Sequence, residues 1–421
     1  MSRLFILKFA AVACLLVAPV LSLADKADAA KVEGASPFYV WSSEITATPG
    51  HLLRQEPLEP RLLLENAATG TRVLYTSEGF SGETVAVSGA VFTPKGEVPK
   101  GGWPVLAWAH GTVGIADVCA PSHKGRGPRD VTYLNHWLAA GYAIVATDYE
   151  GLGTPGTHPY LHCRSEASGT IDGVIAAHQL DAPLSDSWMV TGQSQGGQAA
   201  LCTGAYAEQR ESELQFLGTL ATAPGVNFMQ RFRYGKAEDA NPFIGIALLL
   251  GRGFETFEPS FKREEAFTEK ALALMPYTDQ ACVKELIGLG YQAALTSGES
   301  MKYIPFSDTP GVAAAAEKME IPLQGWTQPV YIAQGTADEL VRYQDVYDFS
   351  ADLCKQGATV TLNVFDGADH SGPMNQGVEE FMQWAAERFA GKPAADNCEE
   401  IDKLVEAEKS SQAQADGSAG Q

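Results

Sequence analysis

One serine in the chain has the sequence context of a catalytic nucleophile. The segment Gly192-Gln-Ser194-Gln-Gly196 matches the pattern G-x-S-x-G. In this pattern a tight strand-to-helix turn exposes the serine hydroxyl, and glycines are needed because the backbone is strained and the helix packs close to the strand. The chain has 42 glycines, so a chance match is the alternative. A predicted strand before Ser194 and a predicted helix after it favour the nucleophile.

A base and an orienting acid should follow such a serine along the chain. Asp338 and His370 each come shortly after a predicted strand, where the sites of parallel sheets are built. We therefore predict Ser194 as the nucleophile, His370 as the general base and acid, and Asp338 as the carboxylate that orients His370. Glu339 and Asp369 are the competing acids. Because Asp369 adjoins His370 and adjacent side chains usually point apart, a loop or capping role is favoured for it.

Acyl transfer also needs two N–H donors for the negative oxygen of its tetrahedral intermediate. We expect one donor from Gln195, directly after the nucleophile, and the other from Thr112, in the loop that follows an apolar strand. Gly111 would permit a close approach in that loop. The neighbouring His110 is assigned a structural role, since His370 has the better position in chain order.

The segment His158-Pro-Tyr-Leu-His162-Cys163 contains side chains that bind zinc in other proteins. Pro159 argues against a helical i, i+4 pairing of the two histidines, and no second cluster of ligands follows. We therefore expect neither a metal site nor a cofactor.

Apolar runs alternate with helical patterns over most of the chain, which is typical of βαβ units and a mostly parallel sheet. Continuous apolar runs at residues 103–109 and 142–147 indicate strands that are buried on both faces. Further strands are predicted at residues 85–92, 188–191, 217–223, 330–333 and 360–365. Helices are predicted at residues 131–140, 171–180 and 195–208.

This alternation stops between Gly225 and Gln328. Residues 243–250 and 281–295 have helical patterns with no strong strand between them, so we expect an inserted helical cap. The apolar run at 243–250 is too short to span a membrane. It is either part of the cap core or one wall of an acyl-binding pocket.

The composition excludes disorder as the dominant state, because 45% of the 421 residues are hydrophobic. The length fits two or three domains, or equally one large catalytic domain with an insertion. The formal net charge is −21, and no stretch gathers basic residues into a patch. This charge distribution disfavours binding to the phosphates of a nucleic acid, so we expect no nucleic-acid partner.

The first residues have the layout of a secretory signal. Arg3 and Lys8 accompany an apolar run at residues 4–23, and small residues follow it. We expect residues 1 to about 30 to be removed on export. A transmembrane anchor is the alternative, which Lys8 and Pro19 disfavour.

Export to an oxidising compartment changes the expected oxidation state of the cysteines. Of seven cysteines, Cys14 leaves with the signal, and the remaining even number predicts disulfides in an oxidising compartment. Six cysteines allow 15 pairings, so counting alone chooses none. Cys202 lies in an apolar stretch, where a buried free thiol is the alternative. The last segment, residues 399–421, is polar with almost no aromatic or β-branched content, so we expect a solvated helix or a disordered tail.

Several segments together resemble the secretory lipase family of α/β-hydrolases. They are His110-Gly-Thr-Val-Gly-Ile-Ala-Asp-Val-Cys119-Ala-Pro-Ser122, Asp148-Tyr-Glu-Gly-Leu-Gly153, Gly192-Gln-Ser-Gln-Gly-Gly197, Gly335-Thr-Ala-Asp338 and Asp369-His370-Ser371. The similarity extends over roughly residues 35–398. It implies an α/β-hydrolase fold with a helical cap, and a secreted carboxylic ester hydrolase that uses Ser, Asp and His without metal or organic cofactor. The expected organisation is a signal and leader at 1–30, a core at 31–225, a cap at 226–328, the rest of the core at 329–398 and a tail at 399–421.

The resemblance also implies two disulfides by position in the family pattern. Cys119 would tie the oxyanion loop to the cap at Cys282, and Cys354 would join Cys398. Cys163 and Cys202 fall outside this pattern, so their state is open.

Lipase and esterase activity stand together as the leading interpretation, with a small-molecule or lipid ester as substrate and the cap in contact with a lipid–water interface. An acyltransferase or serine peptidase of the same fold is the first alternative, because the motif does not distinguish water from another acceptor. A non-catalytic binding protein that kept the fold is the second.

Overall fold

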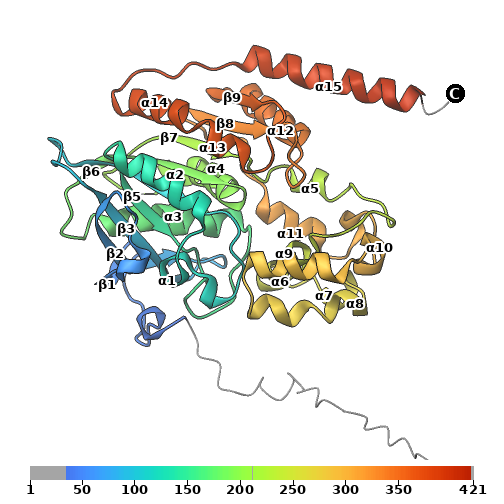
Figure 1. Cartoon of the computed structure of the whole chain (residues 1–421), viewed down its shortest axis with the longest axis horizontal. Coiled ribbons are helices and arrows are strands. Elements are labelled where there is room, and N and C mark those ends of the chain that lie inside the picture. Colours follow the sequence, from blue (N-terminus) through green and yellow to red (C-terminus); the bar gives the residue numbers. More distant parts are fainter. Residues whose placement is uncertain (1–34, 211, 419–421) are drawn as a thin grey trace, which may run out of the picture. The chain divides into compact units, whose positions relative to one another are not determined.

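The computed structural model describes residues 35–210 and 212–418, with side chains to residue 410. One sheet, in the strand order β1-β2-β3-β5-β4-β6-β7-β8-β9, organises this part of the chain (Figure 1). The first three strands and the β3–β5 pair are antiparallel, and every later pair is parallel. The predicted mostly parallel sheet is confirmed. The strands are β1 (Leu52–Pro57), β2 (Ala67–Glu78), β3 (Thr84–Pro94), β4 (Trp103–Ala109), β5 (Ala143–Thr147), β6 (Leu184–Gln193), β7 (Gln215–Thr222), β8 (Val330–Gly335) and β9 (Val360–Phe365).

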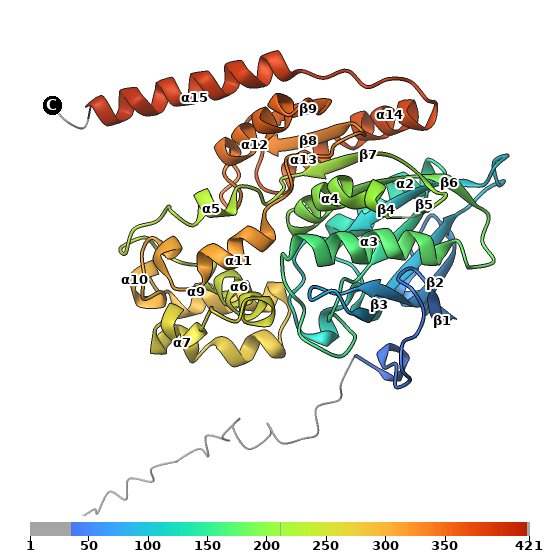
Figure 2. The same cartoon turned by 180° about the vertical axis from the view of Figure 1, so that it is seen from behind.

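Helices cover both faces of the sheet because its central strands are apolar on both sides. In β4, Leu106 and Trp108 belong to the core on the side of α2 and α14, whereas Val105 and Ala107 belong to the core on the side of α3 and α4. Figure 1 is seen from the α2 side and Figure 2 from the α3 and α4 side. The helices around the sheet are α1 (Pro121–Lys124), α2 (Pro128–Ala139), α3 (Cys163–Ala177), α4 (Gln195–Tyr206), α12 (Tyr343–Lys355), α13 (Gly372–Gln376) and α14 (Val378–Phe389).

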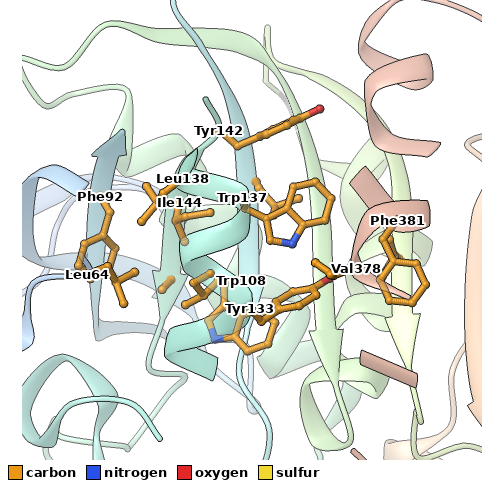
Figure 3. Packing of buried hydrophobic residues seen from close by; sticks show 14 of the residues in the cluster. Leu64, Phe92, Trp108, Tyr133, Trp137, Leu138, Tyr142, Ile144, Val378 and Phe381 are labelled. Atoms are coloured by element: carbon orange, nitrogen blue, oxygen red, sulfur yellow. The ribbon is translucent and has the colours of Figure 1, made fainter. Parts of the chain in front are cut away.

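Aromatic side chains fill the core between the sheet and α2. Trp137 is fully buried, and its ring packs edge-on against Tyr133 and Tyr142 (Figure 3). Trp108 of β4 contacts Tyr133 from the sheet side. These contacts hold α2 on β4 and β5, and they thereby fix the loop between β4 and α2 that begins at His110.

A helical insertion lies between the end of β7 and the start of β8, in yellow to orange in Figure 1. Its helices are α5 (Phe228–Arg231), α6 (Ile244–Phe257), α7 (Arg263–Ala266), α8 (Glu269–Leu272), α9 (Val283–Ala293), α10 (Ser297–Ser300) and α11 (Val312–Met319). They enclose an apolar core of their own, which Ile115, Tyr160 and Leu161 join from the sheet domain. Ile244 and Leu248, from the apolar run that the sequence left open, are fully buried in this core.

The chain ends in α15 (Cys398–Ser418). Of the two expectations for this segment, the described residues form the helix rather than a disordered tail, and most of its side chains up to residue 410 are exposed. Ile401 is fully buried and Val405 is 8% exposed, both in the core that includes α12. These two side chains are one turn apart, and together with the disulfide between Cys398 and Cys354 they hold the first turns of α15 on this core.

Two expectations concern membranes and export. None of the helices in the described residues is long and apolar enough to cross a membrane. The predicted signal at residues 1–30 lies outside the described part of the chain.

Candidate active site

Ser194 occupies a strained turn between β6 and α4. Its backbone dihedrals are φ 61° and ψ −121°, a combination that residues other than glycine rarely adopt. A Cβ atom at Gly196 would lie 1.9 Å from the carbonyl oxygen of Ala109, and one at Gly192 would lie 2.0 Å from the carbonyl oxygen of Gly196. Both positions therefore require glycine. The turn leaves Ser194 half-buried, while the glutamines on either side of it are buried.

His370 and Asp338 are in direct contact. The loops after β8 and β9 bring them together, and Nδ1 of His370 donates to Oδ2 of Asp338 at 2.7 Å. The other oxygen of Asp338, Oδ1, accepts the backbone N–H groups of Leu340 and Val341 at 2.8 and 2.9 Å. Burial raises the pKa of Asp338, but the hydrogen bond and charge of His370 and these two N–H groups outweigh it and hold the pKa below its usual value. The carboxylate is thus ionised and accepts a hydrogen bond from the imidazole.

Gln193 links the serine turn to the histidine loop. Its side-chain amide donates from Nε2 to the backbone oxygen of His370 at 2.9 Å. Gln193 is 1% exposed, so the donor side of this bond is shielded from water. The pattern G-x-S-x-G leaves this position unspecified, and sequence reasoning therefore missed it. Its only signal in the sequence is an amide at the buried end of an apolar strand.

The two competing acids lie elsewhere. Glu339 is exposed. Asp369 is exposed as well, and its Oδ1 accepts the backbone N–H groups of Ser371 and Gly372 at 3.0 and 2.8 Å. This carboxylate therefore shapes the loop that precedes α13.

The loop after β4 packs directly against the serine turn. The space next to Gly111 is closed by the carbonyl oxygen of Gln193, 3.0 Å from where a Cβ atom would stand. The backbone N–H groups of Thr112 and Gln195 find no acceptor among the described residues. Gln195 is the first residue of α4, where N–H groups have no partner within the helix. Unpaired backbone N–H groups of this kind are the groups that bind an anionic oxygen in other proteins.

His110 is held by structural contacts. It is 1% exposed, and its ring nitrogens lie 2.8 Å from the carbonyl oxygen of Gly111 and 3.3 Å from that of Asp148. Burial lowers its pKa. These contacts agree with the structural role that chain order favours.

The histidine and cysteine segment takes other roles. His158 is buried with both ring nitrogens in hydrogen bonds, to the backbone oxygen of Glu150 and to the side chain of Gln195. His162 caps α3 by accepting the N–H of Ser165. Within the described residues no group of three or more His, Cys, Asp or Glu side chains could hold a metal ion.

The six cysteines outside the first 34 residues form three disulfides. Cys119 pairs with Cys282, and Cys354 pairs with Cys398, in the arrangement that the resemblance implies. The third bond joins Cys163 to Cys202, so the free thiol considered for Cys202 is wrong. Sequence counting could not find this pair, because only the packing of α3 on α4 brings the two residues together.

Comparison with known proteins relates this chain to lipases. A model of the secretory lipase family matches residues 128–397. The chain is 24% identical over 389 residues to "Lipase A" of Moesziomyces aphidis, which covers 86% of this chain and 81% of that protein. It is also 24% identical over 371 residues to a protein of Mycobacterium tuberculosis named as a probable inactive lipase, covering 83% and 81%.

A solved structure shares the fold. The closed state of Candida antarctica lipase A superposes with a TM-score of 0.71 at 20% identity, and the match covers 86% of this chain and 87% of that one. The architecture is therefore that of an α/β-hydrolase, as expected.

Proposed function

Because the chain belongs to the secretory lipase family and is a carboxylic ester hydrolase, we propose that it cleaves esters through an acyl-enzyme formed on Ser194. His370 is the general base and acid, and Asp338 orients it. The observation that carries this assignment is the 2.7 Å bond between His370 and Asp338, in a loop that Gln193 ties to the serine turn.

The proton moves through the imidazole. The bond from Nδ1 to Asp338 leaves Nε2 of His370 without a proton, so Nε2 can take the proton of Ser194 as its oxygen attacks the ester carbonyl. The imidazolium then gives that proton to the leaving alcohol. In the second half of the reaction, water attacks the acyl-enzyme while His370 takes its proton. His370 then gives this proton to the oxygen of Ser194, which releases the acid and restores the serine.

The N–H groups of Thr112 and Gln195 are the proposed oxyanion donors. Support comes from their unpaired state and from the contact between their two segments. Donors that are fixed before the reaction stabilise the tetrahedral intermediate without reorganisation, and each is typically worth a factor of about 10² to 10³ in rate.

The cap is proposed to meet a lipid–water interface. Tyr277, Tyr291 and Tyr303 of the insertion are 44%, 61% and 39% exposed. Tyrosine rings suit such a boundary because one end is apolar and the other binds water. Hydrolysis of p-nitrophenyl esters of increasing acyl length, with an emulsified triglyceride and a peptide alongside, tests the substrate. Activity on the peptide alone would contradict an ester substrate.

Export through a cleaved signal is proposed for residues 1 to about 30. The three disulfides of the described residues support an oxidising destination, and the family is secretory. Sequencing the amino terminus of the protein recovered outside the cell tests the proposal, which predicts a start near Asp25 to Lys31. An intact Met1 would contradict it.

The nucleophile is tested by labelling with a fluorophosphonate probe. The wild type should be labelled at Ser194, and Ser194→Ala should lose labelling together with at least about three orders of magnitude of hydrolysis. Ser187→Ala is the matched control, since this serine lies near the start of β6, at the opposite end of the strand from the turn that holds Ser194. Because one relative is named as probably inactive, an unlabelled Ser194 in folded wild-type protein would favour the binding-protein alternative.

A further inference from the structure

One short segment contacts both of the proposed oxyanion residues. The hydroxyl of Tyr160 lies 2.6 Å from Oγ1 of Thr112, and Nε2 of His158 accepts a hydrogen bond from the side chain of Gln195 at 2.9 Å. Both contacts come from residues 158–166, the stretch that leads into and begins α3. The donors themselves lie on two different segments, so this stretch is a common support behind them.

The side chain of Gln195 is fully engaged in that support. Its amide nitrogen donates to Nε2 of His158 and also to Oε1 of Glu166 at 2.7 Å. The same Oε1 accepts the backbone N–H of Leu161 at 3.0 Å. Both amide hydrogens are therefore used, and the rotation of the Gln195 side chain is fixed.

Burial favours the neutral forms of both ionisable side chains in this network. Burial lowers the pKa of His158 to about 3, and its Nδ1–H donates to the backbone oxygen of Glu150 at 2.8 Å, so Nε2 is free to accept. Burial likewise raises the pKa of Glu166 to about 8. The three side chains are at most 3% exposed. Neutral groups that hydrogen-bond in a dry site define one geometry without the desolvation cost of an ion pair.

The support is itself firmly anchored. The disulfide between Cys163 and Cys202 joins its helix to α4, and the amide of Gln198 donates to the backbone oxygen of Leu161 at 3.0 Å. The cap packs on its outer side, where a Cβ atom at Gly253 of α6 would lie 3.0 Å from the backbone oxygen of Tyr160. Displacement of this segment would require movement of α4, of the cap, or of both.

Building on the proposed function, we propose that Tyr160 and His158 are positioning residues for the oxyanion site. Tyr160 positions Thr112. His158, together with Glu166, positions Gln195. Thr112 lies in an irregular loop, where its side-chain bond to Tyr160 restricts the direction of its N–H, alongside the bond from the N–H of Val283 to the carbonyl of Val113. Displacements well below 1 Å already weaken a donor that must meet a developing charge.

The first test compares two buried Tyr–Thr hydrogen bonds. Tyr160→Phe should lower kcat about tenfold with little change in KM, which is less than the loss of a whole donor would cause. Tyr75→Phe is the matched control, because the hydroxyl of buried Tyr75 bonds Oγ1 of Thr147 at 2.8 Å and contacts neither Thr112 nor Gln195. This control should lose stability and keep kcat.

A double-mutant cycle then isolates the contact. Thr112→Val keeps the backbone N–H and removes the hydroxyl, so it should lower kcat as Tyr160→Phe does. The double variant should be no slower than either single variant, because all three lack the same bond. Independent multiplication of the two effects, or a kcat for Tyr160→Phe within twofold of the wild type, would overturn the assignment of Tyr160.

The second test addresses Gln195. Gln195→Met keeps the backbone N–H and the side-chain length but removes both amide donors, so kcat should fall about tenfold. Thermal unfolding of each variant identifies any that fails to fold, and equal kcat values for Gln195→Met and the wild type would overturn the assignment of His158.

Failure of this proposal is separable from failure of the proposed function. If Ser194→Ala is inactive and Tyr160→Phe and Gln195→Met are fully active, only the positioning role is wrong. If Ser194→Ala retains the hydrolysis of the wild type, the acyl-enzyme on Ser194 is wrong and the positioning role falls with it.

Discussion

Replacing Asp338 by asparagine gives the sharpest test of the proposed triad, because the structure decides which way the new amide must point. Oδ1 of Asp338 accepts two backbone N–H groups, so the amide oxygen of the substituted side chain will occupy that position. The NH2 group then takes the place of Oδ2, where it faces Nδ1 of His370 and also Nε2 of Gln334, 3.2 Å away. A donor in this place favours the imidazole tautomer that carries its proton on Nε2. That tautomer cannot accept the proton of Ser194.

The expected loss is large and specific to the chemical step. The wrong tautomer costs up to about 10⁴ in kcat, which corresponds to about 5 kcal/mol of activation free energy. Asp369→Asn is the matched control: its Oδ1 also accepts two backbone N–H groups, and an amide oxygen can replace it without disturbing His370. Steady-state hydrolysis of a p-nitrophenyl ester measures both. A kcat for Asp338→Asn within tenfold of the wild type, or a larger loss in Asp369→Asn, would refute the reasoning.

Three further changes test the fold around the site. Cys119→Ser and Cys282→Ser should each lower the free energy of unfolding by about 2 to 5 kcal/mol and reduce kcat, and the double variant should be no worse than either; additive losses in thermal unfolding would argue against a single shared bond. The pKa of Glu166 is about 8 in the folded state and near 4.5 in the unfolded chain, so the folded protein holds this proton more tightly. As the pH rises between these values, the free energy of unfolding of the wild type should fall relative to that of Glu166→Gln by a few kcal/mol, as measured by chemical denaturation. A difference that stays constant with pH would show that the folded carboxyl is ionised. Ile401→Ala should cost about 2 to 5 kcal/mol, against under about 0.5 for the exposed neighbour Asp402→Ala, and equal effects would mean that α15 does not pack on the core.

The sequence predicted best where one local signal sufficed. A continuous apolar run of a few residues predicts the buried strand β4, and the residues around Ser194 predict a strand-to-helix turn. Both predictions agree with the fold. The family match confirms the resemblance to secretory lipases. The identities of the catalytic residues stay predictions until they are tested by substitution.

Other features depend on partners that are far away in the sequence. The strand β2 (Ala67–Glu78) was not predicted, because it has polar residues at buried positions. Arg72 is 4% exposed and ion-paired with Glu56 and Glu59, so a charged side chain occupies a site where periodicity expects an apolar one. The roles of Gln193 and Gln195 are equally hidden, since each contacts a residue at least 29 positions away.

The disulfide between Cys119 and Cys282 also bears on how the protein is made. The two cysteines are separated by 163 positions, and Cys163 and Cys202 both lie between them. At about 5 to 20 residues per second, Cys119 waits roughly ten to thirty seconds during synthesis before its partner exists. Cys163 follows Cys119 by only 44 positions, so a wrong thiol is within reach for most of that time. Correct pairing therefore depends on disulfide exchange after synthesis, and the yield of active protein should rise when a thiol–disulfide isomerase is supplied with it.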